Sequence, residues 1–311
     1  MIPMWFVFAL ITTVAWGAAD LFYKRGADEN DRYSHLKTGM VVGFVMGLHA
    51  VIMLLTTDMG FDVRNILIYL PVSLMYILSM VVGYFGLRYL ELSISSPIQN
   101  SSGAVTALLC LIILRQTMDG LSAAGVVLTC VGVFALGVIE KRSETPVTSV
   151  GDSKYRSGFA AFMIPVIYCI IDALGTFFDA YYLDDIETTP LVGVTEDTFE
   201  NVANTSYELT FLIAAVMIFI FLKIKKQPIG FIAQKDRGAA AVFETVGQFT
   251  YVYALSGNGV VAAPMISAYC IVSLILSRIF LKEKLTKAQT AAVIIVIAGI
   301  VLMGISEGLA E

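Results

Sequence analysis

Three carboxyl groups and one imidazole lie inside stretches of the chain that are otherwise apolar. They belong to Asp20, Asp172, Glu244 and His49. A charged side chain near the middle of a bilayer costs roughly 3 kcal/mol on insertion scales, so an ionisable residue in an apolar segment usually serves a function. Buried acids can bind a cation or carry a proton. We therefore take Asp20, Asp172 and Glu244 as candidates for cation binding and proton coupling.

Helical spacing places an aromatic side chain beside two of these acids. Residues four apart lie on one face of a helix, so Asp20 shares a face with Trp16, and Asp172 shares a face with Tyr168. A shift of 152 positions lays the first pair on the second. An alternative for Asp20 is a helix-end residue that reaches toward the basic residues after it.

The third acid begins a polar helix face. Glu244, Gln248 and Tyr251 follow one another at i, i+4 and i+7, which places them on one side of a helix. At similar depth, Asp20 and Glu244 could bind one cation or share a proton. An alternative for Glu244 is a carboxyl held by hydroxyl groups for packing.

Other polar and aromatic side chains extend the candidate site. One apolar segment carries the amides of Gln99 and Asn100, and its counterpart later in the chain carries Tyr269. The predicted substrate-binding set is Trp16, Asp20, Tyr76, Tyr84, Gln99, Asn100, Tyr168, Asp172, Glu244, Gln248, Tyr251 and Tyr269. Acids with aromatic faces, and no Lys or Arg deep in a span, favour a cationic or zwitterionic ligand.

The composition is that of an integral membrane protein. Of the 311 residues, 58% are hydrophobic and 14% are charged, whereas soluble domains carry about 25% charged residues. The acidic isoelectric point, about 5.1, argues against nucleic acid as a partner, because nucleic-acid binding needs a basic surface. The partner is instead the lipid bilayer.

The sequence also argues against enzyme chemistry and bound metals. Its four cysteines lie in apolar runs without CxxC or Cys/His spacing, so they read as core residues. HExxH and P-loop patterns do not occur in the sequence. We expect no enzymatic activity, no metal site and no cofactor.

Ten stretches are long and apolar enough to cross a membrane, since a crossing needs about 20 residues. They alternate with short polar loops, and the apolar run that begins near Met1 is expected to be a retained helix. The predicted segments are Pro3–Tyr23, Leu36–Thr57, Asn65–Leu87, Ser93–Leu114, Leu121–Ile139, Gly158–Tyr182, Thr205–Leu222, Gly238–Leu255, Gly259–Leu281 and Lys287–Ser306.

The two halves of the chain resemble each other. Residues 87–140 align with 254–307 without a gap, and the alignment lays Pro97 on Pro264 and Gly132 on Gly299. Such internal similarity is typical of duplicated membrane transporters. We expect an all-α fold with a first five-helix repeat (1–140), a linker (141–157) and a second repeat (158–311). An odd number of helices per repeat inverts the second half in the membrane.

The distribution of basic residues predicts the orientation. Eighteen of the 20 Lys and Arg fall in the loops after the odd-numbered segments or at the segment ends beside them, whereas the loop 183–204 holds acids but no Lys or Arg. Basic loops usually face the cytoplasm. Both termini are therefore predicted to be extracytoplasmic, in a multi-pass protein of the cell membrane (plasma or inner).

One predicted segment carries a stripe of glycines. Gly39, Gly43 and Gly47 recur at a spacing of four. Missing side chains along one helix face let a neighbouring backbone approach closely. We therefore interpret the stripe as a packing surface, not as a binding site.

The chain resembles the EamA-type branch of the drug/metabolite transporter superfamily. The resemblance rests on two five-helix repeats, the pair Trp16-Gly17, early prolines in the fourth and ninth segments, and a Phe-Leu-Lys-Glu-Lys-Leu-Thr break that contains Glu283. The family often has a second Glu after the fourth segment, where this chain has Gln116. The resemblance covers essentially the whole chain, but its degenerate motifs say little about the substrate.

This resemblance implies alternating access by a monomer or homodimer, commonly with proton exchange. It implies a cavity lined mainly by the first, third, fourth, sixth, eighth and ninth segments. The second segment lies off that cavity, which favours His49 as a hydrogen-bonded core residue over a proton relay.

We expect a secondary active transporter of a small metabolite. The favoured substrate is an amine, a quaternary ammonium compound or an amino acid, with proton coupling through Asp20, Asp172 or Glu244. The alternatives are a carrier of a neutral metabolite such as a nucleoside, or a membrane scaffold or sensor that transports nothing.

Overall fold

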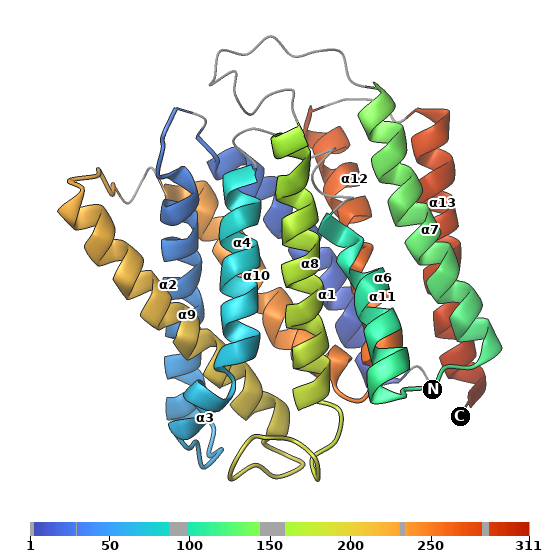
Figure 1. The fold of residues 1–311 in the computed structure, drawn as a ribbon, viewed down its shortest axis with the longest axis horizontal. Coiled ribbons are helices and arrows are strands. Elements are labelled where there is room, and N and C mark those ends of the chain that lie inside the picture. Colours follow the sequence, from blue (N-terminus) through green and yellow to red (C-terminus); the bar gives the residue numbers. More distant parts are fainter. Residues whose placement is uncertain are drawn as a thin grey trace.

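The computed structural model describes residues 3–28, 30–86, 99–143, 159–230, 234–281 and 286–310, and all their regular structure is helical (Figure 1). The helices are α1 (Met4–Gly26), α2 (Ser34–Thr56), α3 (Arg64–Ile68), α4 (Leu70–Gly86), α6 (Ser102–Leu109), the π-helix η1 (Cys110–Leu114), α7 (Gly120–Ser143), α8 (Phe159–Tyr182), α9 (Phe199–Ile224), α10 (Lys235–Leu255), α11 (Gly259–Ser267), α12 (Tyr269–Leu281) and α13 (Lys287–Ala310).

This is a multi-pass membrane protein. Within the described ranges, six helical stretches are long and apolar enough to cross a membrane, and three shorter apolar helices accompany them. Each of the ten predicted segments contains at least one described helix. The number of crossings stays a prediction. The linker residues 144–157, the first residues of the fourth segment with Pro97, and the break with Glu283 lie outside the described residues.

Two predicted segments are interrupted. The chain leaves the helix at Tyr69, between α3 and α4, and at Ala268, between α11 and α12. Pro71 follows the first break and Pro264 precedes the second, and a proline in a helix removes one backbone hydrogen bond. Spans predicted as single helices are therefore bent, in ways that apolar length alone does not reveal.

The α9 helix begins earlier than predicted. It starts at Phe199 instead of Thr205, so residues 199–204 of the predicted acidic loop are helical. Glu200, Asn201 and Asn204 interrupt the apolar run there, which is why the apolar pattern missed this turn. The remaining loop, residues 183–198, lies at the end of the bundle that also holds the two termini (Figure 1). We name this the acidic end and the opposite one the basic end.

Two basic residues that the sequence places in loops are buried at the start of helices. Lys37 of α2 forms a salt bridge of 2.7 Å with Asp31. Arg237 of α10 donates hydrogen bonds to Ser34 Oγ and Thr38 Oγ1. These partners replace water around the two cations, which is why burial is tolerated.

Helices pack in pairs that join distant parts of the sequence. Contacts connect α1 with α10, α4 with α8, α2 with α9, α6 with α11 and α7 with α13. In Figure 1, α2 and α9 stand at one edge of the bundle, whereas α7 and α13 stand at the other. The helices between these edges surround the site described below.

The glycine stripe of α2 packs against α9, as the spacing predicts. Gly43 lies directly against the backbone carbonyl of Phe211, and Gly47 lies against the side chain of Leu212. A methyl group on Gly43 would overlap that carbonyl. Gly39 has more room, since a methyl group there would meet only Ile218, at 3.7 Å.

Candidate functional site

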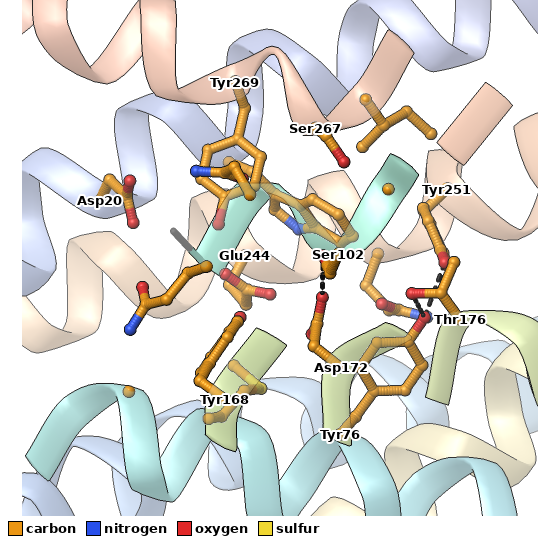
Figure 2. Close-up of a pocket in the computed structure, with 18 of the residues that line it drawn as sticks. Asp20, Tyr76, Ser102, Tyr168, Asp172, Thr176, Glu244, Tyr251, Ser267 and Tyr269 are labelled. Carbon is orange, nitrogen blue, oxygen red and sulfur yellow. Dashed lines mark hydrogen bonds between the residues drawn. The ribbon is translucent and has the colours of Figure 1, made fainter. Parts of the chain in front are cut away.

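All twelve residues of the predicted site line one cavity inside the bundle (Figure 2). They come from α1, α4, the residues just before α6, α8, α10 and α12, and α9 and α11 add further side chains. The structure therefore brings together every residue of the set, namely Trp16, Asp20, Tyr76, Tyr84, Gln99, Asn100, Tyr168, Asp172, Glu244, Gln248, Tyr251 and Tyr269. That they bind a substrate stays a prediction.

The cavity is narrow and lies nearer the basic end. Its lining includes Gly83 and Tyr84, which lie in the last turn of α4 at the basic end. The free volume is about 90 Å³, which is room for several water molecules. A larger ligand requires the surrounding helices to move apart.

Neutral donors hold Asp172 in the cavity. Ser102 Oγ of α6 donates a hydrogen bond of 2.7 Å to its Oδ2, and Ser79 Oγ of α4 donates one of 3.4 Å to its Oδ1. The carboxyl thus joins α8 to two helices of the first half of the chain. Figure 2 shows the contact with Ser102.

The other two cavity acids also receive hydroxyl donors. Asp20 Oδ2 accepts a hydrogen bond of 2.8 Å from Ser273 Oγ, and Glu244 Oε2 accepts one of 3.2 Å from the Tyr23 hydroxyl. Asp20 therefore does not depend on the basic residues after α1 for a partner. Among the described residues that line the cavity there is no Lys, Arg or His.

Aromatic rings form much of the remaining wall. The Trp16 ring lies 5.0 Å from that of Tyr251 and packs edge-on against Tyr269 at 5.9 Å. The rings of Tyr23 and Tyr84 are 4.8 Å apart. Electron-rich ring faces beside carboxyl groups attract a cation by both Coulomb and cation–π forces.

Two amide side chains that line the cavity have a nitrogen without a hydrogen-bond partner among the described residues. The Nε2 atoms of Gln99 and Gln248 are buried and have no hydrogen-bond partner in the described parts of the chain. A buried donor without an acceptor is costly. These two amides therefore offer hydrogen bonds to an oxygen atom of a ligand or of water.

The predicted set omits several lining residues. Tyr23, Thr176, Tyr207 and Ser267 also face the cavity. The spacing could have revealed Tyr23, since Trp16, Asp20 and Tyr23 stand at i, i+4 and i+7. The late predicted start of the seventh segment concealed Tyr207.

Two buried acids outside the cavity lining were also missed. Asp179 of α8 and Glu208 of α9 are fully buried. Both oxygens of Glu208 lie within hydrogen-bond distance of His49 Nδ1, at 2.8 and 2.9 Å. His49 is thus hydrogen-bonded and does not line the cavity. Glu208 seemed to sit in the first turn of its helix because the predicted start was six residues too late.

No metal site is evident. The described residues contain no group of three or more His, Cys, Asp or Glu side chains that could hold a metal ion. The chemistry that the cavity offers is therefore that of its own carboxyl, amide, hydroxyl and aromatic groups.

A solved structure supports the fold. A chain titled "Crystal structure of protein" superposes with a TM-score of 0.68 over 99% of this chain and 98% of its own length, at 10% sequence identity. At this identity the similarity concerns the fold alone. No curated protein matches the sequence.

The sequence itself matches a family. Residues 3–138 and 197–305 match the EamA-like transporter family. These ranges include α1, α4, α10 and α11, which supply much of the cavity wall. The chain therefore belongs to the EamA-like transporter family.

Proposed function

We propose that this membrane transporter moves a small cationic or zwitterionic metabolite by alternating access. The observation that carries the proposal is a cavity with three acids, aromatic walls and no basic side chain among its described lining residues. A cation would supply the missing positive charge. A dianionic ligand would instead meet three carboxyl groups without a basic partner.

The unused amides refine the substrate class. Gln99 and Gln248 present donors, which a simple alkylamine cannot satisfy. A molecule with a cationic group and a carboxylate or hydroxyl oxygen can meet both the acids and the amides. Within the proposed class, this favours amino acids and hydroxylated or carboxylated quaternary ammonium compounds over bare amines.

The cavity acids are also candidates for proton coupling. Among the described residues, neutral hydroxyl groups donate the hydrogen bonds that Asp20, Asp172 and Glu244 accept. A carboxyl group that exchanges a proton for a cationic ligand keeps the total charge of the cavity constant. Such exchange links proton movement to substrate movement.

The helix pairing supports two inverted five-helix repeats with ten crossings. A twofold relation exchanges the first segment with the sixth and the third with the eighth. It therefore turns the pair α1 and α10 into the pair α8 and α4, and both pairs are in contact. A location in the cell membrane, extracytoplasmic termini and a monomeric or homodimeric state complete the proposal.

Thermal unfolding of the purified protein with a panel of probes tests the substrate class. The panel contains ethylamine, choline, glycine betaine, arginine, uridine and acetate. A ligand at 100 times its Kd stabilises the fold by about 2.7 kcal/mol. We expect stabilisation by charged amines, largest for those that also carry an oxygen. Uptake into proteoliposomes at two pH values then tests transport and coupling.

The other outcomes are distinct. Stabilisation by uridine alone would indicate a neutral metabolite and would contradict the charge argument. Stabilisation by acetate, an anion, would also contradict the charge argument. Binding of a probe without uptake would favour a sensor or scaffold.

A further inference from the structure

One buried acid has no role in the cavity. Asp179 lies on α8, three residues before the helix ends at Tyr182 near the acidic end. It is fully buried because neighbouring helices cover it. The Tyr69 hydroxyl donates a hydrogen bond to its Oδ1. Its Oδ2 is buried and has no partner in the described residues.

Among the described residues, the surroundings of Asp179 hold no compensating cation. The titratable groups that interact with its charge are Tyr69 and Tyr76 from the segment of α3 and α4, Tyr207 from α9 and Tyr251 from α10. All four are phenols. A carboxylate buried without a cation is costly, so a carboxyl group in such surroundings is expected to hold a proton.

A break in the helix places the one donor to Asp179. Tyr69 lies where α3 ends and before α4 begins, and its side chain is fully buried. The irregular backbone before Pro71 directs its hydroxyl toward α8. The acid thus sits beside a bend, and movement at the bend would change its only hydrogen bond among the described residues.

Hydroxyl groups lie between Asp179 and the acid of the cavity on the same helix, Asp172. Asp172, Thr176 and Asp179 lie on one face of α8, and seven residues span about 10 Å along a helix. In the gap, the Tyr76 hydroxyl forms hydrogen bonds of 2.9 Å with Thr176 Oγ1 and 2.6 Å with the Tyr251 hydroxyl (Figure 2). These hydroxyl groups lie between the two acids, and a proton that passes from one carboxyl group to the other would move along them.

We infer that Asp179 is a proton-binding site between the cavity and the acidic end. Proton uptake forms an O–H bond on its unpartnered oxygen, and release breaks that bond without any change in oxidation state. The part that Asp179 plays in coupling rests on the proposed function. Its protonation does not, and the two can be measured separately.

Infrared difference spectroscopy of the reconstituted protein during a pH titration measures the protonation. The carbonyl stretch of protonated carboxyl groups is expected to lose a component in Asp179→Asn. The exposed loop residue Asp197 provides a matched control, and Asp197→Asn should leave the spectrum unchanged. An unchanged spectrum in folded Asp179→Asn overturns the inference.

A second variant covers the case in which Asp179→Asn fails to fold. Tyr69→Phe keeps the carboxyl group but removes its donor, so the carbonyl component should persist at a shifted frequency. A spectrum identical to that of the wild type would contradict the assignment. Thermal unfolding of each variant confirms that a folded protein is compared.

Proton flux tests the coupling role. A choline gradient across proteoliposomes that contain a pH-sensitive dye is expected to drive proton movement, reduced at least about tenfold in Asp179→Asn and unaffected in Asp197→Asn. Equal flux in the wild type and Asp179→Asn removes Asp179 from the coupling. Absence of flux in every protein counts against the proposed function with choline, while the infrared result still decides the protonation of Asp179.

Discussion

Each acid of the cavity accepts hydrogen bonds from hydroxyl groups and faces the space that a ligand would enter. Ser273 holds Asp20, Ser102 and Ser79 hold Asp172, and these contacts leave the carboxyl charge without a described cation. A bound cation would therefore meet preorganised acceptors. At the residue scale, this arrangement makes the acids the first groups to test.

Glu244→Gln should remove most of the stabilisation that choline or glycine betaine gives. The change deletes one negative charge but keeps the size of the side chain. A loss of about 1.4 kcal/mol in binding is a tenfold weaker Kd, and we expect at least that. Titrations followed by the unfolding temperature measure it.

The matched control is Glu208→Gln. This acid is buried in α9 beside His49 and does not line the cavity. Ligand stabilisation should persist in that variant, relative to its own unfolding temperature. An equal loss in both variants would contradict a local role for Glu244.

Asp119 lies outside the predicted membrane segments, and its lowered pKa predicts that the stability of the protein depends on pH. A hydrogen bond from Ser306 and backbone N–H donors of Ser122 and Leu121 lower the pKa of Asp119 to about 2. Because an unfolded Asp titrates near about 3.9, the stabilisation is present above that pH and is lost as the pH falls toward 2.

Asp119→Asn should therefore lower the unfolding temperature at pH 7 and lower it less at pH 3. Differential scanning fluorimetry in detergent measures both values. Asp58→Asn, in an exposed loop, serves as the control. A difference that stays constant between the two pH values would show that the charge of Asp119 is not what matters.

Residue types and spacing were enough to identify twelve of the residues that line the cavity. Ionisable groups stand out in apolar runs, and helical periodicity then selects their neighbours. Asp179 and Glu208 escaped the same rule because both lie close to predicted helix ends and neither has an aromatic residue four positions before it, as Asp20 has. Their burial depends on the loop and helices that cover them, which periodicity does not describe.

At the scale of elements, close contact between α2 and α9 depends on missing side chains. Gly43→Ala should destabilise the protein by about 1 to 3 kcal/mol, the usual cost of overpacking, because the methyl group would overlap the Phe211 carbonyl. Gly39→Ala on the same face should be neutral, since its nearest neighbour is 3.7 Å away. Equal thermal stabilities of the two variants would contradict this packing.

Apolar length predicted the positions of the helices but not their interruptions. The breaks at Tyr69 and Ala268 follow from prolines whose effect depends on the packing around them. Ser267 and Tyr269, on either side of the second break, both line the cavity. The irregular backbone thus lies where a cavity accepts it, in agreement with the rule for membrane interiors.

At the scale of the whole molecule, hydrogen bonds hold neighbouring segments of the chain together at the acidic end. Gln116 Nε2 donates to Asp184 Oδ1 at 2.5 Å, while its Oε1 accepts from the Val260 N–H at 2.9 Å. The side chain of Asn65 forms two hydrogen bonds of 2.9 Å with the backbone of Val192. Opening toward this end requires such contacts to break.

Gln116→Glu should weaken these contacts at the acidic end. It replaces the donor to Asp184 by a second carboxylate. Labelling of Ser267→Cys by a membrane-impermeant maleimide, in a background without the four native cysteines, should become faster from the acidic end. Adding Asp184→Asn restores a donor and should slow the labelling again. Unchanged labelling in Gln116→Glu would place the closure elsewhere.

The small free volume of the cavity has a mechanical consequence. Ligand sites in proteins usually measure about 300 to 1,000 Å³, whereas this one holds about 90 Å³. We expect loading to move the surrounding helices apart, so that the loaded protein occupies more space than the empty one. Hydrostatic pressure opposes any expansion, so compression should slow turnover well before it unfolds the helices.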